Sequence, residues 1–176
     1  MWYVIQVRVS SEESIKKQCE KRIPETVLQS CFIPYYESKR KVAGTWKTKR
    51  KILFPGYVFL VSDDAEQLFL ALKKVEGLTK LLGSGGDVVA LSEKEVATLR
   101  RLGGDEQVME MSEGIIVGSR VAVRTGPLCG LEGCIRKIDR HKRKAWLELQ
   151  MFGREQIVEV GLEITEKISA ERYSRK

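Results

Sequence analysis

Residues 117–138 read VGSRVAVRTGPLCGLEGCIRKI, and this stretch decides the architecture of the second half of the chain. Valines alternate with Arg120 and Arg124, which is the period-two pattern of a half-buried strand. The pattern ends at Gly126-Pro127, two further glycines follow, and apolar residues resume at Cys134. Alternation interrupted by Gly and Pro is typical of a small, tightly turned β-module.

The rest of this module contains more short segments of strand character. We predict strands near 119–124, 133–138, 145–151 and 156–160, with a short fifth strand or turn near 162–165. Several short strands in about fifty residues, without a convincing helix, favour a small barrel. The tail, residues 169–176, is expected to fray.

Strand and helix patterns alternate in the first half of the chain. Strands are predicted at 2–9 and 27–36, and a buried strand with a Pro-Gly bend at 52–61. Residues 37–51 are polar and basic, so they could form either a long hairpin tip or a mobile loop.

Three helices are expected between these strands, each announced by an N-cap pattern. Ile15, Cys19 and Ile23 form the apolar stripe of the first helix, and Pro24 ends it. The cap residues are Ser10 with Glu13, Asp63 with Asp64, and Ser92 with Glu95.

Residues 104–113 are polar, acidic and without periodicity, which predicts a linker. The linker separates a first domain, 1–103, from a second domain, 114–168. The glycine-rich turn GSGG at 83–86 lacks the strand-to-helix context of a nucleotide-binding loop.

The chain of 176 residues has 31 Lys or Arg and 24 Asp or Glu, a net charge of +7. The shorter second part is denser in positive charge than the first, which favours a polyanionic partner. Because no apolar run could span a bilayer and the N-terminus reads as a strand, we expect a cytoplasmic protein without a membrane contact.

The residue types needed for a metal site or for catalysis are not clustered in the sequence. The four cysteines form no C-x-x-C pair, and His141 is the single histidine. We therefore expect buried reduced thiols, and no metal, cofactor or catalytic residue.

Two clusters of cations stand out. Residues 136–144, RKIDRHKRK, hold six Lys or Arg between two predicted strands. Because like charges this close in a short turn repel one another, the cluster favours a nucleic-acid contact over a merely solvated turn. Residues 39–51 hold seven Lys or Arg and no acid around Trp46, and here nucleic-acid binding and a solvated turn stay equally open. The candidate nucleic-acid ligands are Arg120, Arg124, Arg136, Lys137, Arg140, His141, Lys142, Arg143 and Lys144, with Lys49 and Arg50.

The motif LFPGYVFL at 53–60 is apolar and aromatic. Val58 and Leu60 are expected in the core. For Phe54 and Tyr57 the core and a protein-binding edge are equally open, because a kinked strand can present aromatic rings to a partner.

These motifs together resemble the NusG family of transcription elongation factors. The resemblance rests on WYVIQVR at 2–8, FPGYVFL at 54–60, the linker, VGSRVAVRTGPLCGLEG at 117–133 and MFGREQIVEV at 151–160. It implies an α+β chain: a NusG-type N-terminal domain with an antiparallel sheet flanked by helices, a linker, and a KOW module folded as a five-stranded SH3-like barrel.

The resemblance also implies partners. The N-terminal domain would bind the clamp helices of bacterial RNA polymerase, bridge its cleft and touch non-template DNA. The matching positions for the polymerase contact are Tyr3, Phe54, Pro55, Gly56 and Tyr57. In the KOW module, which would recruit Rho or a ribosomal protein, Phe152 matches a contact aromatic.

The basic segment 136–144 departs from the general members of the family and is similar to antiterminators of the LoaP type. That similarity implies a monomeric antitermination factor whose KOW module holds structured nascent RNA. Two alternatives stay open: a general NusG factor whose KOW module binds Rho or a ribosomal protein, and a ribosome-associated protein that binds ribosomal RNA.

Overall fold

The computed structural model describes residues 1–81 and 90–175, the side chains of 79–81 excepted. The chain divides into two compact units. The first consists of Met1–Pro34 with Phe54–Thr98, and the second of Tyr35–Leu53 with Leu99–Lys176. The glycine-rich turn predicted at 83–86 lies outside the described residues.

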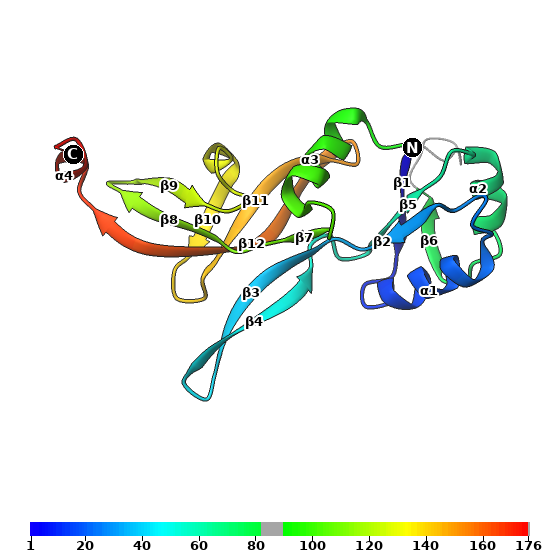
Figure 1. Ribbon diagram of the computed structural model, residues 1–176, viewed down its shortest axis with the longest axis horizontal. Helices are drawn as coiled ribbons and strands as arrows, with labels where there is room; N and C mark the ends of the chain where they lie inside the picture. Colours follow the sequence, from blue (N-terminus) through cyan, green and yellow to red (C-terminus); the bar gives the residue numbers. More distant parts are fainter. Residues whose placement is uncertain (82–89, 176) are drawn as a thin grey trace. The chain divides into compact units, whose positions relative to one another are not determined.

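The first unit is built on a four-stranded antiparallel sheet in the order β2-β5-β1-β6 (Figure 1). The two central strands carry almost continuous apolar sequence because both of their faces are buried. The strands are β1 (Trp2–Val7), β2 (Ser30–Phe32), β5 (Tyr57–Val61) and β6 (Leu78–Leu81).

Two helices of this unit, α1 (Glu12–Arg22) and α2 (Ala65–Leu72), bury short apolar stripes. Ile15 and Cys19 are buried on α1, as the predicted stripe requires, and Leu68 and Leu72 are buried on α2. The side chain of Gln18 on α1 donates to the backbone oxygen of Glu76, so α1 lies beside the segment that follows α2.

The predicted helix caps are confirmed at two helices and wrong at one. Asp64 accepts a hydrogen bond from the backbone nitrogen of Gln67, and Ser92 with Glu95 forms a reciprocal capping box before α3 (Glu93–Gly103). Ser10 does not cap α1: its φ is 75°, and Ser11 precedes the first helical residue without a side-chain cap bond. The hydroxyl of Ser11 donates instead to the carbonyl oxygen of Arg8, within the turn.

In the second unit, residues 35–52 form a long β-hairpin. Its strands β3 (Tyr35–Val42) and β4 (Thr45–Ile52) pair residue for residue, and β7 (Val108–Met109) adds a short parallel strand to β3. Ala43 and Gly44 both have positive φ, which is the backbone that a two-residue hairpin turn needs. Of the two options left open for 37–51, the hairpin is therefore the one adopted.

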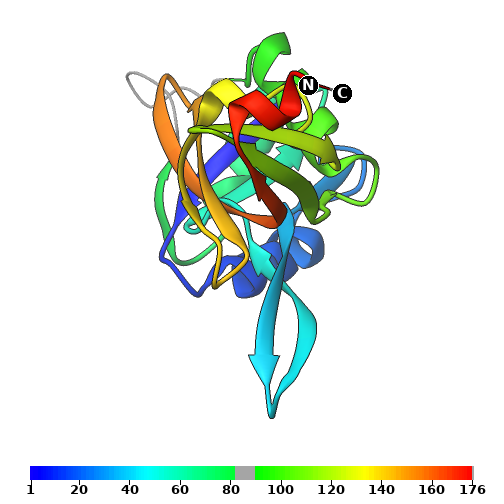
Figure 2. The same ribbon diagram turned by 90° about the vertical axis from the view of Figure 1, so that its left-hand side faces the viewer.

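The remaining strands form a five-stranded sheet in the order β10-β11-β12-β8-β9. Strand β12 pairs with β11 antiparallel through its first half and with β8 parallel through its second half. In the described part of the chain no ladder joins the edge strands β9 and β10, so the sheet is curved but not closed (Figure 2). The bounds are β8 (Ser112–Val117), β9 (Arg120–Thr125), β10 (Ile135–Asp139), β11 (Lys144–Met151) and β12 (Arg154–Ile168), with a 3-10 turn η2 (Glu132–Cys134).

The strands predicted near 119–124, 133–138, 145–151 and 156–160 are confirmed as β9, β10, β11 and β12. The separate fifth strand or turn expected near 162–165 is wrong, because β12 continues without a break to Ile168 and pairs there with β8. The structure also contains elements that the sequence pattern did not indicate. The segment 104–113 contains β7 and the first residues of β8, and Met109 and Ser112 are buried. The tail forms a short helix, α4 (Ala170–Tyr173), at a position expected to fray. The domain boundaries at 103 and 114 remain predictions.

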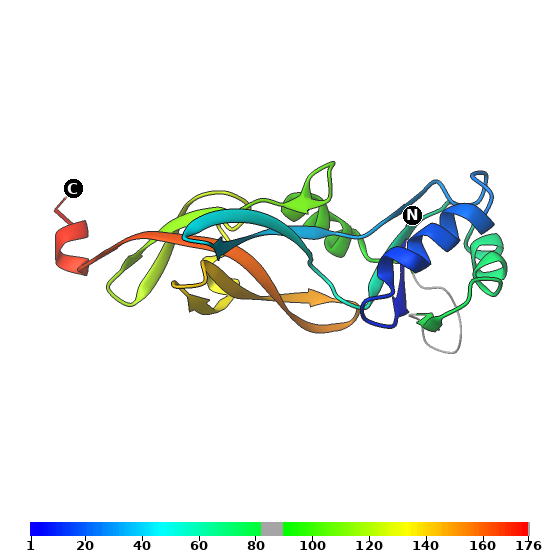
Figure 3. The same ribbon diagram turned by 90° about the horizontal axis from the view of Figure 1, so that it is seen from below.

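Strand β12 crosses β3 closely within the second unit (Figure 3). A Cβ added to Gly161 would overlap both the sulfur of Met111 and the backbone oxygen of Glu37. Only a residue without a side chain therefore allows the backbones to approach this closely. This crossing brings the β3–β4 hairpin against the five-stranded sheet.

Candidate nucleic-acid interface

Residues from both basic clusters predicted from the sequence line one groove of the second unit. One wall comes from the β3–β4 hairpin and the other from the turn between β10 and β11. The groove has a volume of about 420 Å³. Its lining residues are Ser38, Lys39, Arg40, Lys41, Trp46, Lys49 and Lys51 from the hairpin, and His141, Lys142 and Lys144 from the turn and β11.

Glu163 on β12 links the two walls of this groove. One carboxylate oxygen accepts from Nζ of Lys39 at 2.7 Å, and the other lies 3.3 Å from the guanidinium of Arg143. All three side chains keep only about a fifth to a quarter of their surface exposed, at 21%, 27% and 25%. Partial burial reduces the solvent screening that weakens exposed ion pairs, so Glu163 can hold both cations in place.

Arg143 also lies over the ring of Trp46, with its guanidinium carbon 3.9 Å from the ring centroid. Trp46 is half-buried on β4, and Arg143 has a left-handed backbone with φ of 51°. A guanidinium over an indole face is a favourable cation–π arrangement. Trp46 is the member of this pair that lines the groove, and Arg143 packs on its ring.

Glu159 forms a second link between the hairpin and the sheet. It accepts from Nζ of Lys144 at 2.9 Å and from the hydroxyl of Tyr36 at 3.0 Å. Burial opposes ionisation of Glu159, but these hydrogen bonds outweigh it and lower its pKa. Burial, together with the neighbouring carboxylate, raises the pKa of Tyr36.

The other predicted nucleic-acid residues occupy varied positions. Arg136 makes a bidentate contact with Glu148, at 2.7 and 2.9 Å, which raises the pKa of Arg136 and commits that side chain to the sheet. Arg140 is exposed at the turn, and Arg50 is exposed on β4 next to Lys49. Arg124 is exposed at the end of β9.

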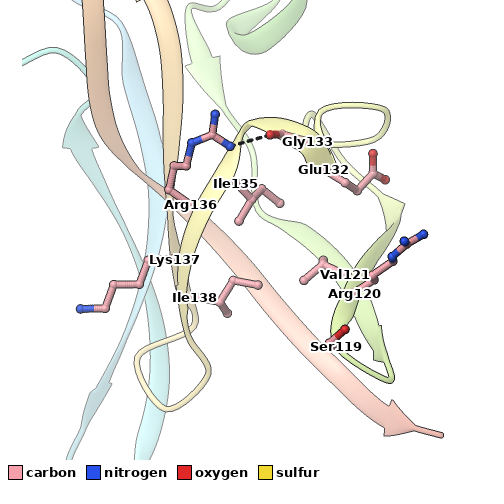
Figure 4. A pocket seen from close by; sticks show the side chains of 9 residues that line it. All are labelled: Ser119, Arg120, Val121, Glu132, Gly133, Ile135, Arg136, Lys137 and Ile138. Atoms are coloured by element: carbon pink, nitrogen blue, oxygen red, sulfur yellow. Dashed lines mark hydrogen bonds between the residues drawn. The ribbon is translucent and has the colours of Figure 1, made fainter. Parts of the chain in front are cut away.

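A second pocket, of about 440 Å³, lies between the edge strands β9 and β10 (Figure 4). Ile135 and Ile138 point toward Val121 across it, while Lys137 points the other way. Lys137 lies 4.8 Å from the ring centroid of Trp146. Arg120, Arg136 and Lys137 border this pocket, and none of these three residues lines the basic groove.

The residues expected to contact polymerase lie in the first unit and are mostly buried. Tyr3 is 2%, Phe54 2% and Tyr57 6% exposed, whereas Pro55 is exposed. Gly56 is buried with φ of 84°, and its backbone nitrogen donates to the carboxylate of Glu12 at 2.7 Å. Sequence reasoning missed Glu12, because a carboxylate in the first turn of a helix reads as solvent-facing.

Sequence reasoning also missed two half-exposed rings beside this motif. Phe32 stacks on Phe59 with ring centroids 5.4 Å apart, and Trp2 meets Phe32 edge-on at 5.0 Å. The register places Trp2, Phe32 and Phe59 on one face of the sheet. The alternation of Trp2 with Tyr3 along β1 is the signal that could have identified this face.

Phe152 lies in the turn between β11 and β12. Strand β11 begins at Lys144 and ends just before Phe152. It is half-buried and has a positive φ of 59°, which is rare for an aromatic residue. Phe152 is therefore separated from the basic groove by the length of β11.

No helix in the part of the chain that the structure describes is long and apolar enough to cross a membrane.

The first 100 residues match the family model described as transcription termination factor NusG. Transcription termination/antitermination proteins NusG from several Staphylococcus aureus strains are 29% identical over 175 residues, covering 95% of each chain. A solved structure that describes domain interaction in Thermotoga maritima NusG has a TM-score of 0.61 and 25% identity, covering 93% of each chain. Because the family model covers more than half of the sequence, the chain belongs to the NusG family of transcription termination/antitermination factors.

Proposed function

We propose that this protein is a transcription elongation and antitermination factor of the LoaP type. In this proposal the first unit binds the clamp helices of bacterial RNA polymerase, and the second, a KOW module of SH3-like type, holds structured nascent RNA. The factor acts as a monomer in the cytoplasm and has no enzymatic role. The observation that carries the proposal is the groove that gathers cations from the hairpin and from the β10–β11 turn in a member of the NusG family.

The polymerase contact is assigned to the aromatic face around Phe54 and Tyr57. Both rings are buried, so in this proposal they shape the surface, and the half-exposed Trp2 and Phe32 supply the direct contact. Aromatic side chains commonly anchor a partner in this way. Holding polymerase in its unpaused form requires tighter binding to that form than to the paused one.

The RNA contact is assigned to Arg140, His141 and Lys142, which are exposed at the β10–β11 turn. Phosphate contacts by Lys and Arg make affinity strongly dependent on salt. Simultaneous engagement of polymerase and transcript would raise the effective concentration of each contact. Non-template DNA is a further proposed contact of the basic hairpin.

Two pairs of variants test this division of labour in the full chain. The double variant Trp2→Ala with Phe32→Ala should no longer bind purified polymerase but should still bind structured RNA. The double variant Arg140→Glu with Lys142→Glu should still bind polymerase but no longer bind the RNA. Leu70→Ala, at an exposed apolar site of α2, and Lys17→Glu with Lys21→Glu, on exposed sites of α1, are the matched controls. Failure of the wild-type protein to bind polymerase would refute the proposal.

A second candidate function is a general NusG factor whose KOW module binds Rho or a ribosomal protein. The left-handed, half-buried Phe152 favours it, because strained backbone conformations gather at functional sites. This candidate would be supported if the chain captures Rho or a ribosomal protein, if Phe152→Ala no longer does so, and if Arg140→Glu with Lys142→Glu still does.

A further inference from the structure

The groove between the β3–β4 hairpin and the β10–β11 turn carries more positive charge than the protein itself neutralises. Glu159 and Glu163 pair with Lys144, Lys39 and Arg143. Among the described residues, no ion pair engages the other lining cations, which are Arg40, Lys41, Lys49, Lys51 and Lys142. Cations held this close repel one another, and a polyanion in the groove relieves that repulsion.

The groove is concave and receives cations from two opposite walls. Lys49 comes from the hairpin and Lys142 from the turn, so phosphates between them would be contacted from both sides. This arrangement suits a single strand whose backbone follows the groove. A duplex would present its phosphates on a convex surface, which would meet the rims of the groove more readily than its floor.

A planar stacking surface lies in the same groove. Trp46 lines it, and Arg143 covers the indole at 3.9 Å while Glu163 holds the guanidinium at 3.3 Å. Aromatic rings and guanidinium planes are the surfaces on which unpaired bases stack. Paired bases within a helix have no free face to offer, so this feature also favours an unpaired strand.

From these observations we infer that the hairpin and the turn form one composite site for an unpaired RNA strand, with a base stacked on the Trp46–Arg143 pair. The inference rests on the proposed RNA-binding function and makes it more specific. It assigns the groove-lining cations of segments 39–51 and 141–144 to the same ligand, although the sequence presents them in two separate clusters. Glu163 acts as a positioning residue that keeps the two walls in register.

The test measures fluorescence anisotropy of the full chain with a labelled single-stranded 12-nucleotide RNA, the same RNA annealed to its complement, and the single-stranded DNA of equal sequence. We expect the single-stranded RNA to bind most tightly. Trp46→Ala should weaken its binding by about fivefold or more and leave the duplex nearly unchanged. Trp46→Phe, which keeps an aromatic plane, should restore most of the loss.

Charge reversals on the two walls test whether the site is composite. Lys49→Glu and Lys142→Glu should each weaken the binding of the single-stranded RNA and make the dependence of affinity on salt less steep. Lys17→Glu on α1 and Phe152→Ala at the far end of β11 are the controls for charge and for aromatic content, and both should bind as the wild type does. Circular dichroism and thermal melting check that each variant is folded.

Several outcomes would overturn the inference: preference for the duplex or for DNA, unchanged affinity in Trp46→Ala, or sensitivity to only one of the two walls. The proposed function has a separate readout. A chain that binds polymerase and structured RNA but ignores the single-stranded probe would refute the composite site and leave that function standing.

Discussion

The buried carboxylate of Glu12 accepts a hydrogen bond from the backbone nitrogen of Gly56 at 2.7 Å, and this contact joins the first turn of α1 to the Pro55-Gly56 bend. Glu12 is only 1% exposed. The oxygen of Gly56 in turn accepts from the backbone nitrogen of Val7 at 2.8 Å. The bend that precedes β5 is thus held from both sides, and with it the position of the aromatic motif.

Glu12→Ala should destabilise the protein by about 1–3 kcal/mol, because the buried nitrogen of Gly56 would lose its acceptor. Glu12→Gln keeps an oxygen acceptor and should cost less. The measurement is the free energy of unfolding in urea. Glu25→Ala, at an exposed position, serves as the control and should change little; an equal loss in both alanine variants would contradict the assigned role of Glu12.

Gly161→Ala should destabilise the second unit by about 1–3 kcal/mol, since its methyl group would overlap Met111 and the backbone of β3. Gly133→Ala is the matched control, because a Cβ there meets nothing within 4 Å. The readout is thermal unfolding followed by circular dichroism. A stable Gly161→Ala would mean that β12 and β3 do not cross as closely as described.

Phe32→Ala should lower the free energy of unfolding by about 1–3 kcal/mol, because it removes two ring contacts, with Phe59 and with Trp2, that are each worth about 0.5–1.5 kcal/mol. Phe32→Leu keeps the apolar surface without the ring and should lose less. Urea denaturation of the two variants, side by side, separates the ring contribution from burial. Equal losses would show that ring geometry adds nothing here.

Stability should depend on pH through Glu159. Its pKa is lower in the folded protein than its ordinary value of 4.5, so the stabilisation is present above that value and is lost as the pH falls through the folded pKa. At about pH 7 the wild-type protein should therefore unfold at a higher urea concentration than Glu159→Gln. At about pH 3.5 the difference between their urea midpoints should be smaller. A gap that widens in acid would reverse the assigned sign.

Much of the local structure follows from the sequence pattern. The alternating residues of β9, the capping box at Ser92 and the apolar stripe of α1 each depend on neighbours a few positions away. The failure at Ser10 is also local, because Ser10 and Ser11 are both plausible caps and only the left-handed backbone of Ser10 decides between them. The two-residue strand β7 had no such signal, because its pairing with β3 comes from a distant segment.

By itself, the sequence determined most of the strands and helices, the family and the two clusters of cations, because periodicity, turn chemistry and charge depend on neighbouring residues. Only the tertiary structure decided that Lys49 and Lys142 line one groove, and that Phe54 and Tyr57 are buried. The physical reason is that both outcomes depend on contacts between segments distant in the chain. At Gly161, for example, the missing side chain lets β12 approach β3, and no pattern of neighbouring residues predicts that crossing.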